Sequence, residues 1–373
     1  MMKSRFIYWL VYSGMWLFSA LPFRMLYILS DFNYLLMYRI GRYRRKVVRE
    51  NLKKSFPEKS KEERLQIERR FYRYLSDYML EDLKMLHMSP EDLYQRMTYK
   101  NTEQYLELTE KYGGIIVMIP HYANYEWLIG MGAIMKPGDV PVQVYKPLKD
   151  KYLNELFQRI RSRFGGYNIP KHSTAREIIK LKREGKKMVV GLITDQWPSG
   201  NEKYWTTFLG QETAFLNGAE RIAKMMNFPV FYCDLTKPGR GYCIAEFKLM
   251  TEKPKETSEG EITEMFANYL EQTIRREPAY WLGGCGHINV GKLLKLNVKG
   301  GDDESIGSYS ELERVRYASY FSSVCGPLFE ERTSRSLCSR QWLYGCFCGD
   351  APGRISLCQN HCARSESWLC GWI

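Results

Sequence analysis

Short apolar runs alternate with amphipathic segments from residue 113 to residue 282, and this alternation restricts the folds that the chain can adopt. The runs predict buried strands at residues 115–119, 141–145, 188–195, 229–237 and 242–250. Apolar residues at helical spacing predict helices at residues 126–135, 153–165, 174–187, 217–227 and 261–278. Strands that alternate with helices favour an α/β fold, with a mixed, largely parallel sheet flanked by helices.

The chain is long enough for a full hydrophobic core. It has 373 residues, of which 45% are hydrophobic and 26% charged, so a disordered or fibrous protein is excluded. Residues 60–110 are highly charged and carry apolar side chains at helical spacing, as at Phe71, Leu75 and Met79. These predicted helices join the alternating region in one expected domain, residues 58–282.

The N-terminal region contains eighteen consecutive uncharged residues, Phe6–Phe23. That length is at the short end of what a bilayer-spanning helix needs, about 20 residues. A signal peptide fits poorly, because Trp and Tyr are frequent and no small-residue cleavage site follows. A buried amphipathic helix is the alternative. We expect an N-terminal membrane-anchoring helix, either spanning the bilayer or lying deep in its interface.

A basic cluster follows this segment and accounts for much of the net charge of +13. Residues 39–57 hold eight Lys or Arg and only one acidic residue, Glu50. Basic residues beside an apolar segment are typical of the cytoplasmic side of a membrane and suit anionic headgroups. A solvated helix face is the alternative. Residues 1–57 are therefore predicted to be a membrane anchor with a basic juxtamembrane segment, and the domain of residues 58–282 to be cytoplasmic.

A histidine and a carboxylate lie just after the first predicted strand, in the segment His121–Glu126. In open α/β sheets, sites form at the carboxyl ends of strands, so both side chains could enter one site there. A carboxylate that orients a histidine makes a general base. Asp195, at the end of another strand, could orient a site group or cap a turn. The alternative for His121 is a purely structural role.

The spacing H-x4-E after an apolar strand, behind an anchor-like segment and a basic stretch ending in Ser55-Phe56-Pro57, resembles the lysophospholipid acyltransferase superfamily. The bacterial lipid A acyltransferases, the late lauroyl and myristoyl transferases, are the most similar branch. Further motifs follow in that family's order: Tyr145-Lys146-Pro147, Arg159 with Arg161 and Arg163, Arg176, Ile193–Gln196, Phe208–Gly210 and Asn217–Arg221. The resemblance covers residues 1–282 and implies a lysophospholipid-acyltransferase-like fold.

The resemblance implies transfer of a fatty acyl chain from acyl carrier protein to a hydroxyl of a lipid A precursor, at the bacterial inner membrane. His121 would be the base and Glu126 would hold its imidazole, with no acyl-enzyme, no cofactor and no metal. The expected substrate-binding residues are Tyr145, Lys146, Arg161, Arg163, Arg176, Asp195 and Gln196. For the three arginines the physical basis is bidentate binding of phosphate, and the alternative is a solvated helix face.

Two other functions stay open at this point. The acceptor could be another glycolipid or a lysophospholipid. The chain could also be a basic protein that binds a membrane or nucleic acid without catalysis. Against nucleic acid, the basic residues gather beside the apolar segment, and no aromatic platform motif is present. We therefore expect acyl carrier protein, a lipid A precursor and the membrane as partners, and no nucleic acid.

The last 91 residues, 283–373, differ from the rest of the chain. They hold eight of the ten cysteines, lack apolar periodicity and are nearly neutral, with ten basic and nine acidic residues. Similar proteins continue after Trp281-Leu282 with a Trp-Ser-His-Lys-Arg-Trp-Lys-like sequence. Codons compatible with Gly284–Lys292 encode Leu-Trp-Ser-His-Lys-Arg-Trp-Lys in a neighbouring frame. We expect an out-of-frame, disordered tail. A Cys-rich module with zinc or disulfides is the alternative, although its spacings lack paired C-x2-C motifs.

Resequencing the gene across codons 283–292 tests the frame hypothesis. We expect either a base error at this junction or a genuine shift, with the Trp- and Lys/Arg-rich sequence in the neighbouring frame. The hypothesis would be discarded if resequencing confirmed the given reading frame and the neighbouring frame encoded unrelated residues. The Cys-rich module would then remain.

Overall fold

The computed structural model of the chain describes residues 5–148, 150–195 and 204–282. The predicted tail and Gln196 lie outside these residues. Seven strands form one sheet in the order β1-β9-β8-β2-β5-β3-β4, and β6 pairs with β7 in a separate hairpin. The strands are β1 (Met97–Lys100), β2 (Gly114–Ile119), β3 (Val140–Tyr145), β4 (Tyr167–Pro170), β5 (Met188–Ile193), β6 (Tyr204–Phe208), β7 (Gln211–Phe215), β8 (Val230–Gly239) and β9 (Tyr242–Thr251).

The sheet is mixed and mostly parallel. Strands β8, β2, β5, β3 and β4 all run in one direction. Strand β9 is antiparallel to β8, and β1 is parallel to β9. The α/β class and the mostly parallel sheet predicted from the alternation are therefore confirmed. The carboxyl ends of the five parallel strands share one edge, where functional side chains can meet.

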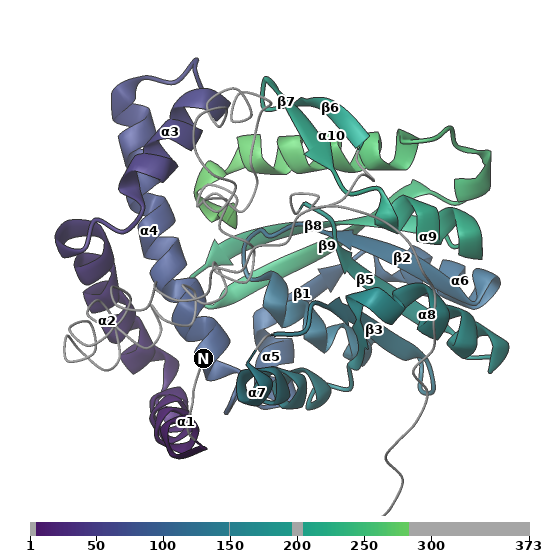
Figure 1. Ribbon diagram of the computed structural model, residues 1–373, viewed down its shortest axis with the longest axis horizontal. Helices are drawn as coiled ribbons and strands as arrows, with labels where there is room; N and C mark the ends of the chain where they lie inside the picture. The colour runs from purple at the N-terminus through teal and green to yellow at the C-terminus, as the bar shows by residue number, and fades with distance from the viewer. Residues whose placement is uncertain (1–4, 149, 196–203, 283–373) are drawn as a thin grey trace, which may run out of the picture. The chain divides into compact units, whose positions relative to one another are not determined.

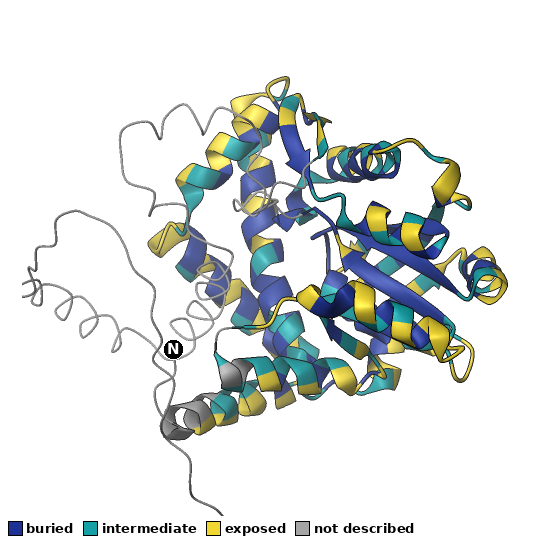
Figure 2. Ribbon diagram, turned by 45° about the vertical axis from the view of Figure 1, so that its right-hand side comes forward, coloured by how far each residue is buried: buried dark blue, intermediate teal, exposed yellow. Residues whose placement is uncertain are grey.

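Helices lie on both sides of the sheet, with α9 and α10 above it and α5 and α7 below it in Figure 1. Each turns a buried face inward and an exposed face outward, whereas the central strands are buried (Figure 2). The helices are α1 (Arg5–Ala20), α2 (Phe23–Tyr34), η1 (Leu35–Ile40), α3 (Arg45–Ser55), α4 (Lys61–Lys84), α5 (Pro90–Arg96), α6 (Thr102–Tyr112), η2 (Tyr125–Ile134), α7 (Lys151–Ser162), η3 (Lys171–Ser173), α8 (Thr174–Arg183), α9 (Gly218–Met226), η4 (Pro254–Glu256), α10 (Glu261–Arg276) and η5 (Pro278–Tyr280).

The five long predicted strands are present, but four strands were not predicted: β1, β4, β6 and β7. Each of these has only four or five residues and mixes buried with exposed positions. Such short segments carry too few residues for a clear period of two. The helix predicted at residues 126–135 is a tighter 3₁₀ helix, η2.

The N-terminal region, residues 5–34, forms two helices rather than one. Helix α1 ends at Ala20, and α2 begins at Phe23 after Pro22, whose extended backbone (φ −59°, ψ 149°) separates them. Proline fixes φ and favours the first turn of a new helix. Within the described residues, no helix is both long enough and apolar enough to cross a membrane.

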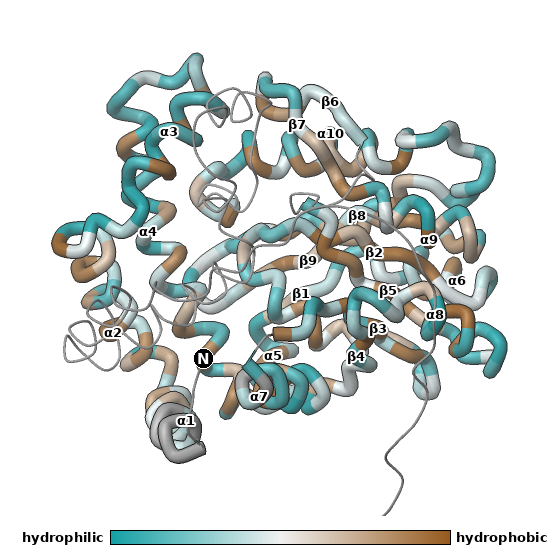
Figure 3. Tube along the Cα trace, viewed as in Figure 1, coloured by the Kyte–Doolittle hydropathy of each residue, from teal (hydrophilic) through white to brown (hydrophobic). Residues whose placement is uncertain are grey.

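The central strand β2 is buried along its whole length. Hydrophobic segments of the chain run through these inner strands (Figure 3). Gly114 begins β2 because nothing larger fits: a Cβ there would stand 2.6 Å from Phe228 Cζ and 3.0 Å from the Met188 carbonyl oxygen. This close packing fixes the position of the start of β2 against Phe228 and β5.

A buried carboxylate ties α10 to the β8–β9 hairpin. Asp234 is 3% exposed and accepts hydrogen bonds from Arg276 (2.6 and 3.0 Å), Lys248 (2.6 Å) and Thr273 (3.2 Å). Burial alone would raise the pKa of Asp234. The hydrogen bonds and charges of Arg276 and Lys248 outweigh burial and hold that pKa below its ordinary value of 3.8. The carboxylate therefore stabilises the fold above that pH, and the contribution is lost as pH falls through the folded-state pKa.

Asp234→Asn is expected to lower the free energy of unfolding by about 2 kcal/mol at pH 7, because Arg276 and Lys248 lose their partner. The difference from wild type should begin to shrink as the pH falls below about 4, where Asp234 of the unfolded chain takes up a proton, and should be lost as the pH falls through the lower pKa of the folded protein. Urea unfolding at several pH values measures both effects. Glu252→Gln is the control, since it removes an exposed pair with Lys111. An Asp234→Asn defect of equal size at all pH values would contradict the prediction.

Candidate active site

Neighbouring strands β2 and β5 place His121 beside Asp195. The two strands are parallel and in register, with Ile119 opposite Ile193. His121 stands two residues beyond the end of β2, and Asp195 two residues beyond the end of β5. The Thr194 backbone N–H donates to the Ile119 carbonyl at 3.2 Å and continues the pairing past the strand ends. Two residues 74 positions apart in sequence therefore meet at the carboxyl edge of the sheet.

The Asp195 carboxylate contacts His121 twice. Its Oδ1 lies 2.6 Å from the imidazole Nδ1, and its Oδ2 accepts the His121 backbone N–H at 2.8 Å. Both side chains are buried, at 7% and 0% exposure. An ionised carboxylate at Nδ1 selects the tautomer that carries its proton there, which leaves the Nε2 lone pair as a base. This is the arrangement of a general base with an orienting carboxylate.

The loop that carries His121 is held in an unfavourable conformation. Ala123 has φ +48°, a left-handed backbone that costs a residue with a Cβ about 1–2 kcal/mol. Its N–H donates to the Tyr280 carbonyl at 2.9 Å, and its carbonyl accepts from the Tyr74 hydroxyl at 2.7 Å. The His121 carbonyl also accepts from the Leu282 N–H at 3.0 Å. Segments distant in sequence thus fix the loop.

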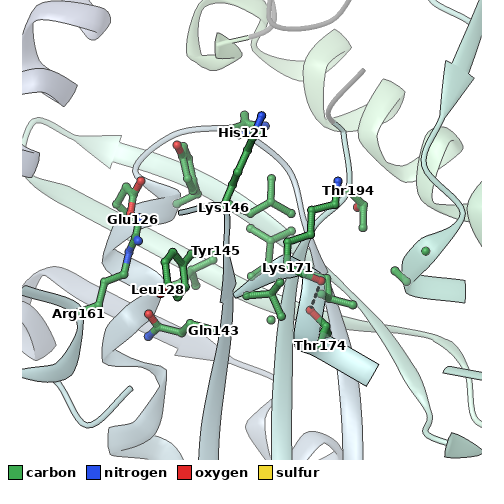
Figure 4. A pocket seen from close by; sticks show the side chains of 18 of the residues that line it. His121, Glu126, Leu128, Gln143, Tyr145, Lys146, Arg161, Lys171, Thr174 and Thr194 are labelled. Carbon is green, nitrogen blue, oxygen red and sulfur yellow. Dashed lines mark hydrogen bonds and ion pairs between the residues drawn. The ribbon is translucent and has the colours of Figure 1, made fainter. Parts of the chain in front are cut away.

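His121 lines a cavity of about 470 Å³ at this edge of the sheet (Figure 4). Much of the lining is apolar, with side chains contributed by β2, η2, α7, β5 and α9: Ile119, Leu128, Ile129, Met131, Phe157, Leu192 and Ile222. Among the described residues, three cationic side chains also line it: Lys146, Arg161 and Lys171. The cavity therefore combines a base, an apolar wall and positive charge.

Glu126 lines the same cavity, and its carboxylate faces Arg161. The Oε2 atom of Glu126 lies 3.7 Å from Nη2 of Arg161, and the two side chains point toward one another in Figure 4. The sequence prediction gave Glu126 the position at the imidazole. The structure places Asp195 on Nδ1, because β5 ends in register with β2, whereas Glu126 lies in the first turn of η2 toward α7.

The other predicted residues divide into two groups. Tyr145, Lys146 and Arg161 line the cavity. Arg163 instead donates to the carbonyls of Met85 at 3.2 Å, Met88 at 3.3 Å and Leu86, and so joins α7 to the turn after α4.

Arg176 also lies away from the cavity. It is on α8, its side chain is 81% exposed, and its guanidinium lies 3.7 Å from Glu177. Gln196 falls outside the described residues.

The structure adds polar residues to the cavity that were not predicted as site residues. Lys171, Thr174, Thr194 and Asn217 all line it. The motifs quoted for the family resemblance already contained Thr194 and Asn217, which is the signal that could have selected them. No signal in the sequence marked Lys171 or Thr174 as site residues, since a Lys or a Thr before a helix is common. Among the described residues, the buried Thr194 Oγ1 and Asn217 Oδ1 atoms have no hydrogen-bond partner.

The two cysteines that the structure describes are remote from nucleophilic chemistry. Cys233 on β8 and Cys243 on β9 are buried free thiols. Burial raises the pKa of Cys243 to about 12 and that of Cys233 still further. A thiol with such a pKa is not a thiolate at neutral pH, so neither has the character of a catalytic nucleophile.

Comparison with known proteins gives the same assignment as the motifs. No curated protein sequence matches the chain. Residues 1–282 match the family model described as "Bacterial lipid A biosynthesis acyltransferase". The match ends at the residue where the resemblance in motifs stops, and it includes every described residue of the cavity. The chain therefore belongs to the bacterial lipid A biosynthesis acyltransferase family, and is an enzyme that transfers an acyl group onto a lipid A precursor.

Proposed function

We propose that the enzyme transfers a fatty acyl chain directly from acyl carrier protein to a hydroxyl of the lipid A precursor, with His121 as general base. The observation that carries this proposal is the His121–Asp195 pair on the wall of the cavity. Nε2 of His121 takes the proton of the acceptor hydroxyl as its oxygen attacks the thioester carbonyl. The new C–O bond forms, the C–S bond breaks, and the imidazolium returns its proton to the leaving thiolate.

In this mechanism Asp195 orients the imidazole and stabilises the imidazolium. Direct transfer is supported by the two buried, protonated cysteines, which leave the base to activate the acceptor itself. The buried Thr194 hydroxyl lines the cavity and can donate a hydrogen bond to the developing oxyanion.

The lining of the cavity suits both substrates. Its apolar side chains, among them Leu128, Ile129 and Phe157, can accept the acyl chain. Lys146, Arg161 and Lys171 can bind acceptor phosphates, and Arg161 also faces the Glu126 carboxylate. Of the three arginines predicted to bind phosphate, we therefore keep Arg161 in that role, and we add Lys146 and Lys171.

Asp195→Asn is expected to lower kcat by about 10²–10⁴-fold, because the amide favours the wrong tautomer of His121. Glu126→Gln is the matched carboxylate control and should lower kcat less than tenfold. The assay is acyl transfer from acyl carrier protein thioesters to a lipid A precursor, followed by mass spectrometry. His121→Ala should abolish the transfer. A larger loss in Glu126→Gln than in Asp195→Asn would return the orienting role to Glu126.

We also propose that the N-terminal helices attach the enzyme to the cytoplasmic face of the inner membrane by lying in its interface. Exposed apolar residues recur at spacings of three and four along α2 and into the start of η1: Met25, Ile28, Phe32 and Leu35, which are 48–69% exposed. These spacings place them on one helix face. Helix α1 and η1 add exposed apolar side chains: Trp9, Trp16, Leu17 and Ile40. Exposed cations follow directly in the chain: Arg39, Arg42, Lys46, Arg49, Lys53 and Lys54.

Vesicle binding tests the proposed attachment. Ile28→Ser combined with Phe32→Ser should weaken partition onto phosphatidylglycerol vesicles at least tenfold, because two exposed apolar side chains are lost from one face. Met225→Ser is the control, since Met225 is also 48% exposed but lies on α9. Cosedimentation measures the partition, and added salt should weaken it through the basic cluster. Equal partition of both variants and wild type would rule out this face.

A further inference from the structure

A buried carboxylate, Glu81, lies between the loop that carries His121 and two other parts of the fold. It is on α4, and its side chain is 1% exposed. The side chain of Asn124, three residues after His121, donates to its Oε2 at 3.0 Å. Lys237 on β8 donates to both oxygens at 2.8 and 2.9 Å and is itself only 4% exposed.

Oxygen Oε1 of Glu81 accepts two more hydrogen bonds. The Tyr27 hydroxyl on α2 donates at 3.1 Å, and the Gly241 backbone N–H in the β8–β9 turn also donates at 3.1 Å. Four donors from four segments thus converge on one carboxylate. Burial by itself would raise the pKa of Glu81. The positive charge of Lys237 and the hydrogen bonds from Lys237, Asn124 and Tyr27 outweigh burial and hold that pKa below its ordinary value. The group is therefore ionised at neutral pH.

Asn124 lies where the loop most needs support. The preceding residue, Ala123, has the left-handed backbone described above, and such a conformation persists only where surrounding contacts impose it. The Asn124 side chain is fully buried, and its hydrogen bond to Glu81 restrains the loop directly after this residue. Tyr74 and Tyr280 restrain Ala123 itself. His121, two residues earlier, depends on the same short loop for its place beside Asp195.

We propose that Glu81 is a positioning residue: through Asn124 it sets the loop that holds His121 in its productive geometry. This inference rests on His121 acting as the base in the proposed function. Glu81 also holds Tyr27, so the loop is joined to α2, the helix whose opposite face carries the exposed apolar side chains. Small displacements of a catalytic group lower the rate strongly, up to about 10²-fold for 1 Å.

Two double variants separate positioning from stability. Replacing Glu81 alone would leave Lys237 as a buried, unpaired charge, so both variants also carry Lys237→Met. Glu81→Met/Lys237→Met removes the carboxylate that accepts from the Asn124 side chain. Glu81→Gln/Lys237→Met restores an amide of the same shape. That amide can pair with Asn124 in either orientation, because Asn124 can present its N–H or its oxygen.

We expect kcat of Glu81→Met/Lys237→Met to fall at least tenfold, with KM for both substrates changed less than about threefold. Glu81→Gln/Lys237→Met should keep kcat within about threefold of wild type. Asp77→Asn is the control for a loss of packing between α4, α2 and the β8–β9 hairpin. Asp77 lies one turn earlier on α4 and binds Ser30 and Arg240, so it also joins α2 to the hairpin. Its variant should keep kcat, even where its melting temperature falls.

Hydrogen exchange supplies a readout that needs no substrate. Amide exchange in the peptide that covers residues 119–127 should accelerate in Glu81→Met/Lys237→Met and stay near wild type in Glu81→Gln/Lys237→Met. The inference is overturned if the Met variant keeps its kcat and its exchange rates, or if both double variants lose kcat equally and in step with their melting temperatures. Absence of transfer by wild type would instead count against the proposed function, and the exchange rates would still decide whether Glu81 holds the loop.

Discussion

The active site depends on the in-register pairing of β2 with β5. His121 and Asp195 each follow their strand by two residues, and their contact at 2.6 Å exists only because Ile119 lies opposite Ile193. A slip of two residues would move one partner along the sheet by about 7 Å and separate them. The register is in turn fixed by packing, since Gly114 admits no side chain where β2 starts against Phe228.

The short loop after β2 cannot hold its own conformation. Several of its polar groups bond to Tyr74 and Glu81 of α4, Tyr280 of η5, and the Leu282 backbone. Helices α1 and α2 pack against α4 and so support the helix that holds this loop. A family model that matches from residue 1 is consistent with this dependence.

Much of the fold could be predicted from residue patterns because the central strands are strongly apolar. Strand β2 is buried at every position, and a run of that kind has few alternatives. Strands β1 and β4 have four residues each and could not be found in this way. The N-terminal segment shows a different limit. Its composition suits either a helix that spans the bilayer or one that lies in the interface. Composition does not show the break at Pro22, which divides the region into two helices.

The sequence by itself determined the α/β class, the position of His121 at a strand end and the family, because these depend on local patterns and short motifs. Tertiary structure alone decided which carboxylate meets the imidazole, since Glu126 is near His121 in sequence but Asp195 is near it across the sheet. It also separated the roles of Arg161 and Arg163, which are only two positions apart in sequence. Arg161, near the end of α7, lines the cavity, whereas Arg163, directly after that helix, donates to backbone carbonyls.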